Sequence, residues 1–142
     1  MTDSARDEWT IAIGARTRWL LAPNKVPTGE TEPIEKLFPH PRATPLREHD
    51  LDDVFGDLAR DAQGRATASL IGKTQRLDVV VGPNFRSMVI WAPRDRPFIC
   101  FEPMAGITNA INLAHRGVYK ELQTVAPGAT WRESFWVTPR GF

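Results

Sequence analysis

A short apolar segment that runs into a carboxylate and two amides is the part of this sequence best suited to chemistry. Residues 98–101 are apolar and lie between two prolines, and their length and flanks predict a buried strand. Glu102 then lies at the end of that strand. Partial desolvation there would make it a better proton acceptor than a surface glutamate, as a general base requires. A strand-end glutamate can also pair with an arginine or cap the following turn.

A second feature could contact a ligand. Asp50, Asp52 and Asp53 lie close together in the chain, so their charges repel unless solvent, a cation or a polyhydroxylated ligand occupies their acceptors. A solvated turn is the simpler explanation of such a group.

The composition predicts one globular domain covering residues 1–142. With 42% hydrophobic and 25% charged residues, the chain can bury one core. Residues 1–8 are polar and charged, and we expect them to be disordered. Twelve prolines and ten glycines interrupt the chain too often for a helical bundle. The fold class predicted is all-β, an antiparallel β-sandwich.

Alternating apolar residues and turn-forming residues divide the chain into short strands. The first two are expected to pair as a hairpin, and a loop follows them at residues 23–30. The predicted strands cover residues 9–13, 16–21, 31–38, 65–71, 76–81 and 87–92, the apolar run at 98–101, a strand ending at Ala126, and residues 129–138.

Charge, cysteine content and hydropathy exclude several classes of protein. The formal net charge is +1, so the chain lacks the basic surface expected of a nucleic-acid binder. Cys100 is the only cysteine, so no intramolecular disulfide can form, and no cysteine-based metal site is expected. The sequence has no signal peptide and no apolar run that could span a membrane. We therefore expect a cytoplasmic protein with no membrane partner.

Five short sequence blocks follow one another along the chain. They are Val-Pro-Thr-Gly-Glu at 26–30, Leu-Asp-Asp-Val-Phe at 51–55, Cys-Phe-Glu-Pro at 100–103, Asn-Ala-Ile-Asn at 109–112 and Ala-Pro-Gly at 126–128. These blocks occur in the order found in aldose 1-epimerases. From about Arg16 onward, the chain therefore resembles the C-terminal part of a galactose mutarotase-like protein.

The resemblance implies a supersandwich fold, a monosaccharide ligand and roles for individual residues. Glu102 matches the family's general base, Asp52 matches the aspartate that contacts sugar hydroxyls, and Asn109 begins the block that follows the base. The reaction interconverts aldose anomers. A base takes the proton of the anomeric hydroxyl, an acid protonates the ring oxygen, and the opened ring closes on its other face. Only protons move, so the reaction needs no cofactor and no metal. Such a site also needs an aromatic wall to hold the sugar ring; Trp91 could be that wall, or it could be a large core or interface residue.

The chain departs from the family at the acid. The family's acid histidine precedes the Pro-Thr-Gly block, whereas no histidine precedes Pro27 here, and His40, His49 and His115 are expected at the surface. The missing acid could come from another side chain, a second chain or a longer protein. Alternatively, the chain is a non-catalytic carbohydrate-binding or structural β-module. A sheet cut from a larger fold exposes edge strands, so we also expect a homo-oligomer.

Overall fold

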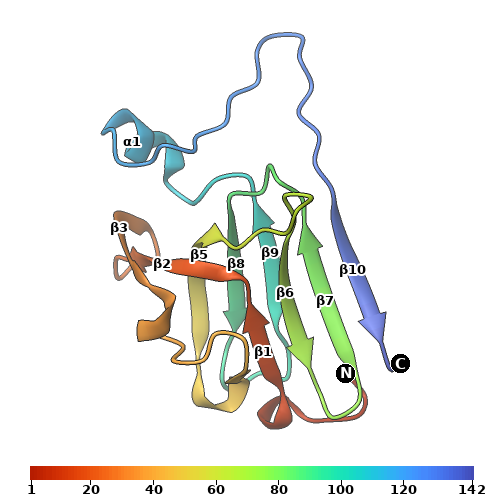
Figure 1. Ribbon diagram of the computed structural model, residues 1–142. Coiled ribbons are helices and arrows are strands. Elements are labelled where there is room, and N and C mark those ends of the chain that lie inside the picture. The colour runs from red at the N-terminus through yellow and green to blue at the C-terminus, as the bar shows by residue number, and fades with distance from the viewer.

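Two five-stranded antiparallel sheets face each other and form a β-sandwich, as predicted (Figure 1). The computed structural model describes all 142 residues, Met1 to Phe142. The first sheet has the order β10-β7-β6-β1-β4 and the second the order β3-β2-β5-β8-β9. The strands are β1 Thr10–Ile13, β2 Ala15–Leu21, β3 Pro27–Pro33, β4 Thr44–Pro45, β5 Leu51–Leu58, β6 Ala66–Ile71, β7 Arg76–Val81, β8 Ser87–Ala92, β9 Cys100–Met104 and β10 Phe135–Arg140.

The main core lies between the sheets and draws side chains from both. Ile11 and Val81 of the first sheet and Phe55 and Ile90 of the second are fully buried in one cluster of 18 residues. Strands β6, β7 and β8 agree with the predicted segments to within one residue. Each combines β-branched residues with flanking turn residues, so local sequence was sufficient to locate them.

The predicted hairpin of the first two strands is wrong, because β1 and β2 belong to different sheets. β1 pairs with β4 and β6, and β2 pairs with β3 and β5. Gly14 connects β1 to β2 at the point where the chain passes from one sheet to the other. Its N–H donates to the carbonyl of Thr67, and its own carbonyl accepts from the N–H of Ala59. A Cβ atom at Gly14 would lie 2.9 Å from the Thr67 oxygen, so this close backbone approach requires glycine.

Residues 1–8 are part of the folded structure, which differs from the disorder expected. Asp3 accepts hydrogen bonds from the backbone N–H groups of Thr74 and Gln75, at 2.6 and 2.8 Å. Hydrogen bonds, led by that from the neighbouring Ser4 hydroxyl, hold the pKa of the Asp3 carboxyl well below its usual range. The short 3₁₀ turn Arg6–Glu8 follows.

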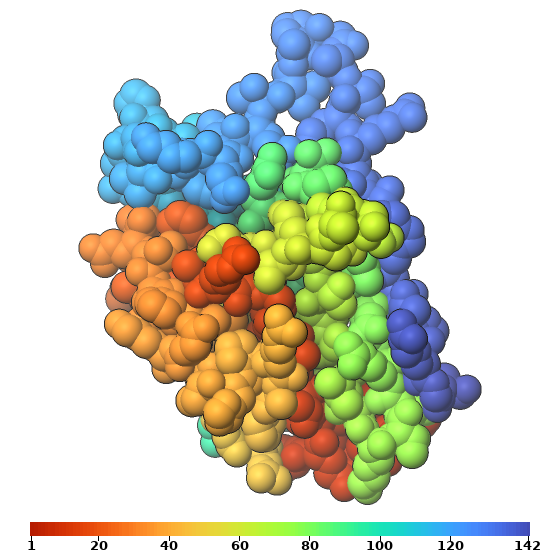
Figure 2. All heavy atoms as spheres, in the orientation of Figure 1, coloured from red at the N-terminus to blue at the C-terminus, as the bar shows by residue number.

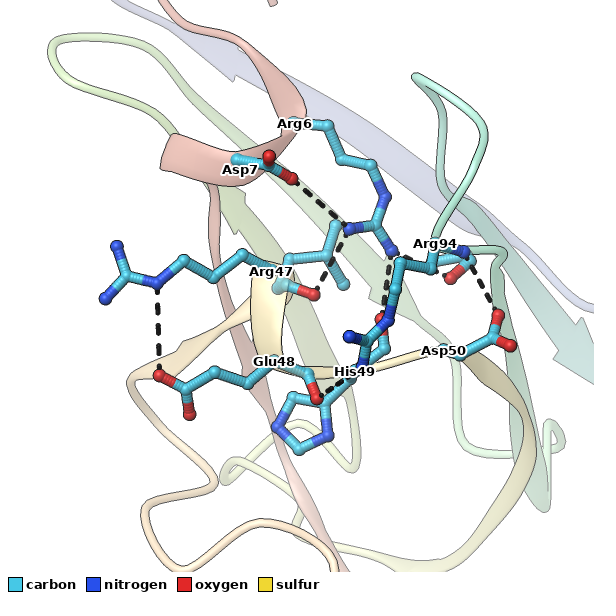
Figure 3. A network of polar contacts seen from close by, with 9 residues as sticks. Arg6, Asp7, Arg47, Glu48, His49, Asp50 and Arg94 are labelled. Carbon is cyan, nitrogen blue, oxygen red and sulfur yellow. Dashed lines mark hydrogen bonds and ion pairs between the residues drawn. The ribbon is translucent and has the colours of Figure 1, made fainter.

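Arg6 fixes this N-terminal segment to the sandwich, and composition could not indicate that role. It is 6% exposed, and its guanidinium donates to the backbone carbonyls of Leu46, His49 and Ala92 (Figure 3). Arg94 in the same network donates its backbone N–H to Asp50. Carbonyl oxygens accept from both terminal nitrogens of this buried guanidinium, which offsets much of the cost of its burial, whereas its Nε has no partner.

The predicted strand at residues 31–38 is only partly correct. β3 begins at Pro27, inside the predicted loop at residues 23–30, and ends at Pro33; residues Ile34–Lys36 form a 3₁₀ turn. Ile34 and Phe38 are four residues apart and both fully buried. A helical turn brings both side chains to the same side and close together along the chain direction. In an extended strand they would also share a face but would lie much farther apart.

The last third of the chain contains less strand than predicted. The helix α1, Ala110–His115, was not predicted. Residues 116–134, which include the expected strand ending at Ala126, form no helix or strand (Figure 1). β10 begins at Phe135 rather than 129. Figure 2 shows the segment around α1 against the β2–β3 region, with the following chain extending beyond the sandwich. No helix of the protein is long and apolar enough to cross a membrane.

Candidate functional site

An open hollow of about 400 Å³ lies on the outer face of the second sheet. Residues from β5, β8 and β9 form its floor and one flank, and the β2–β3 turn contributes to the opposite flank. Glu102, Asp52 and Trp91, which the sequence nominated separately, all line this hollow. The nine lining residues are Leu21, Lys25, Asp52, Val54, Val89, Trp91, Glu102, Met104 and Thr108.

Strand register explains why these side chains meet. Asp52 lies opposite Trp91, and Val89 of the same strand as Trp91 lies opposite Glu102. Residues two apart on a strand point to the same face. Neighbouring strands lie about 4.8 Å apart and alternate residues about 6.8 Å apart, so the Cα atoms of Asp52 and Glu102 are about 12 Å apart. Their side chains can therefore approach a ligand from two sides of β8.

Glu102 is placed differently from the sequence-based expectation. It lies in the middle of β9 rather than after a strand, and its side chain is exposed rather than partly desolvated. Pro103 can follow within the strand because β9 is at the sheet edge, where a missing N–H is tolerated. Glu102 forms no ion pair with an arginine and caps no turn, so its carboxylate oxygens are available to a ligand.

The three neighbouring aspartates do not form one cluster. Asp52 is 45% exposed, and its Oδ2 lies 3.6 Å from Nζ of Lys25 at the edge of the hollow. Asp53 is 3.0 Å from Arg18. Asp50 accepts a hydrogen bond from the backbone of Arg94. Each carboxylate thus has a separate environment, and only Asp52 faces the hollow.

Trp91 presents an accessible aromatic surface at the floor of the hollow. Its side chain is 42% exposed, so it is not a core residue. Phe98 supports it from the side, with ring centroids 4.9 Å apart and an angle of 67° between the rings. An aromatic ring held in this way can pack against the apolar face of a sugar.

Asn109, the other residue that the resemblance proposed for ligand binding, does not line the hollow. It has a left-handed backbone, with φ of 69°, directly before α1. Its amide nitrogen lies 3.3 Å from the carbonyl oxygen of Pro27, and its Oδ1 accepts from Asn112 at 2.7 Å. Asn109 therefore fastens α1 to the start of β3. Thr108, its neighbour, lines the hollow instead.

A small second core closes one side of this face. Ile107, Leu113 and Tyr119 pack with Val54 of β5 in a cluster separate from the main core. Val89 packs against the same cluster and also lines the hollow, so part of the floor of the hollow rests on this packed apolar cluster. Burial, with the nearby charge of Glu121, raises the pKa of the Tyr119 hydroxyl.

No histidine lines the hollow. His40 and His115 are exposed at other places in the fold, as expected. His49 is half-buried instead of lying on the surface, and its ring stands edge-on to Phe38 with centroids 4.8 Å apart. Burial lowers the pKa of His49. The structure also contains no group of three or more His, Cys, Asp or Glu side chains arranged to hold a metal ion.

Lys25 and Val89 are the lining residues of most interest that sequence reasoning missed. Lys25 lies in the turn between β2 and β3 with φ of 64°, a conformation that few residues other than glycine and asparagine adopt. The turn itself was predicted from its prolines. Nothing local indicates that the turn folds over β5, because that depends on the pairing of β2 with β5.

Comparison with known proteins identifies the fold. No family model matches the sequence. The structure is similar to that of a galactose mutarotase-like protein from Clostridium acetobutylicum, with a TM-score of 0.78 and 19% sequence identity. The similarity covers 96% of this chain and 43% of that protein, so this chain spans less than half its length. The two proteins share a β-sandwich fold, which confirms the predicted fold class.

Proposed function

We propose that this chain binds a monosaccharide in the hollow on the second sheet and interconverts aldose anomers, with Glu102 as the general base. The observation that supports this proposal is the meeting of Glu102, Asp52 and Trp91 in one hollow. The similarity in fold to a galactose mutarotase-like protein is consistent with it.

Each of these side chains has a property that the reaction needs. Glu102 is exposed and unpaired, so its carboxylate can accept the proton of the anomeric hydroxyl. Asp52 can accept hydrogen bonds from sugar hydroxyls on the far side of the hollow. Trp91 offers the flat apolar surface on which the ring would rest. Such a site needs no metal or cofactor, because ring opening transfers only protons.

Polarimetry of freshly dissolved glucose or galactose tests the catalytic role. Glu102→Gln should fold normally and reduce the rate of anomer interconversion by about 10²–10⁴-fold, because an amide cannot accept the proton. Glu30→Gln removes an exposed carboxylate of β3 outside the hollow and should leave the rate unchanged. Equal rates for Glu102→Gln and the wild type would remove Glu102 from the mechanism.

A non-catalytic sugar-binding or structural module is the alternative. One observation favours it: no histidine lines the hollow. Titration with sugar, followed by tryptophan fluorescence, separates the two functions. A binding module would give a saturable change that Trp91→Phe diminishes, with no increase in the rate of mutarotation.

We also propose a homo-oligomer that forms through β10. This edge strand exposes Phe135, Trp136 and Val137. The N–H of Gly82 donates to the carbonyl of Ser134, so by alternation the N–H groups of Phe135 and Val137 point away from β7. A second copy could add its own β10 to this free edge.

Light scattering measures the oligomeric state directly. We expect a mass of at least two chains at micromolar concentration, and Trp136→Lys should shift the protein toward monomer. Phe142→Lys changes an exposed apolar residue outside the strand and should have little effect. A wild-type protein that remains monomeric would contradict the proposed assembly.

A further inference from the structure

The hollow contains one cationic side chain, Lys25. Among the nine lining residues, only Lys25 carries an ammonium group. The other two ionisable side chains of the hollow are the carboxylates of Asp52 and Glu102. Its Nζ lies 3.6 Å from Oδ2 of Asp52. The side chain is 63% exposed, so a ligand in the hollow can reach it. An ammonium group donates up to three hydrogen bonds to acceptors such as a sugar ring oxygen, and it can transfer one proton.

The strand order places Lys25 and Glu102 on opposite flanks of the hollow. Lys25 approaches from the β2–β3 turn and contacts β5, whereas Glu102 lies on β9. β8 runs between β5 and β9 and contributes Val89 and Trp91 to the floor. A sugar ring lying on this floor would therefore have a proton acceptor on one side and a proton donor on the other.

We propose that Lys25 is the proton donor that protonates the sugar ring oxygen, the role for which the sequence offers no suitably placed histidine. This inference rests on the proposed function of the hollow. The left-handed backbone of Lys25 turns the chain over β5, and the ion pair with Asp52 keeps the ammonium group at the hollow.

The proton transfers balance over one cycle. Glu102 takes the proton of the anomeric hydroxyl, and the oxygen of that hydroxyl forms a double bond to C1. The bond between C1 and the ring oxygen breaks, its electron pair goes to the ring oxygen, and Lys25 gives that oxygen a proton. After rotation about the bond between C1 and C2, the neutral Lys25 amine takes the proton back while the ring oxygen attacks the other face of C1. Glu102 returns its proton to the carbonyl oxygen.

A matched pair of lysine variants tests the proposal. Lys73 is the control, because its Nζ lies 2.7 Å from Glu8 in an ion pair whose exposure, 60% and 44%, resembles that of Lys25 and Asp52, 63% and 45%. We expect Lys25→Met to lower the rate of glucose or galactose mutarotation by about 10²-fold, the low end for a positioned acid or base. Lys73→Met should keep the wild-type rate.

Lys25→Arg separates proton donation from a purely electrostatic role. Arginine preserves the positive charge beside Asp52 but does not release its proton at accessible pH. The rate of Lys25→Arg should therefore fall as in Lys25→Met, while sugar binding, measured by tryptophan fluorescence, changes less than the rate. A wild-type rate in Lys25→Arg would show that only the charge matters and would overturn the proposal.

The outcomes also distinguish this inference from the function on which it rests. If Glu102→Gln loses activity and Lys25→Met does not, the hollow is catalytic and Lys25 is not the donor. If the wild type binds sugar without accelerating mutarotation, or does not bind it, both the reaction and the role of Lys25 are wrong. Thermal melts of each variant confirm that a lost rate is not lost folding.

Discussion

Asp52 and Asp53 are neighbours in the sequence but belong to two different polar clusters of the second sheet. Alternation along β5 directs Asp52 to the outer face and Asp53 to the opposite face. We call the cluster of Arg18, Glu32 and Asp53 the inner cluster, and the cluster of Lys25, Asp52 and Glu102 the outer cluster.

Ion pairs and hydrogen bonds within the inner cluster occupy its charged groups, and Lys36 adds a further cation 3.6 Å from Glu32. Arg18 donates to Asp53 at 3.0 Å and, through Nε, to Glu32 at 3.0 Å. The carboxylates are only 15% and 16% exposed. Hydrogen bonding from Arg18, assisted by the charges of Arg18 and Lys36, lowers the pKa of Glu32 although desolvation opposes this shift.

The outer cluster leaves acceptors open to solvent. Asp52 has one loose partner at 3.6 Å, and Glu102 has no ion-pair partner. The comparison shows how two clusters of similar composition differ in use. Charges that are mutually paired and shielded stabilise the fold, whereas exposed charges around an aromatic floor can exchange water for a ligand.

Removing Arg18 should have the largest effect on stability. Arg18→Met leaves two shielded carboxylates without their principal donor, and we expect the melting temperature to fall by about 3–8 °C. The outer cluster does not contain Arg18, so sugar-induced changes in tryptophan fluorescence should persist. Thermal unfolding followed by circular dichroism measures the first effect. An unchanged melting temperature would mean that the inner cluster is not a stabilising unit.

Paired substitutions of the two aspartates sharpen the contrast. Asp53→Asn should lower the melting temperature by about 2–5 °C with little change in sugar affinity, because its amide cannot replace the charge beside Arg18. Asp52→Asn should weaken sugar binding by roughly three- to tenfold and leave the melting temperature within about 1 °C. Fluorescence titration and thermal melts of both variants are compared directly. The same response from both positions would contradict the division into two clusters.

The smallest expected effect is a difference between Arg18→Met and the wild type in how the melting temperature changes at acid pH. The folded pKa of Glu32 is lowered from its ordinary value of 4.5, so the unfolded chain binds protons more readily in acid. The contribution of this group is complete above pH 4.5 and is lost as the pH falls through the lower folded pKa. Arg18→Met removes the cause of the shift. Its melting temperature should therefore decrease less than that of the wild type between about pH 5 and pH 3.

Melts at several pH values test this expectation. Other carboxylates with lowered pKa values, including Asp3 and Asp78, are present in both proteins, so only the difference between the two curves reports on the inner cluster. Parallel curves for Arg18→Met and the wild type would exclude the predicted linkage.

The fold class and several strands of this protein could be predicted from short stretches of sequence. Alternation of apolar residues and the placement of turn residues predicted β6, β7 and β8 nearly to the residue. These signals act over a few residues and are therefore readable along the chain. The residue types of Glu102, Asp52 and Trp91 also nominated three members of the hollow before their positions were known.

Which of these residues lie side by side depends on contacts between segments that are far apart in the chain. The separation of β1 from β2 depends on contacts of Gly14 with Thr67, more than fifty residues away. The place of Lys25 beside Asp52 likewise depends on the pairing of β2 with β5, and the exclusion of Asn109 depends on its contact with Pro27. Strand periodicity specifies alternate faces, but long-range pairing decides which strands adjoin and which side chains share a surface.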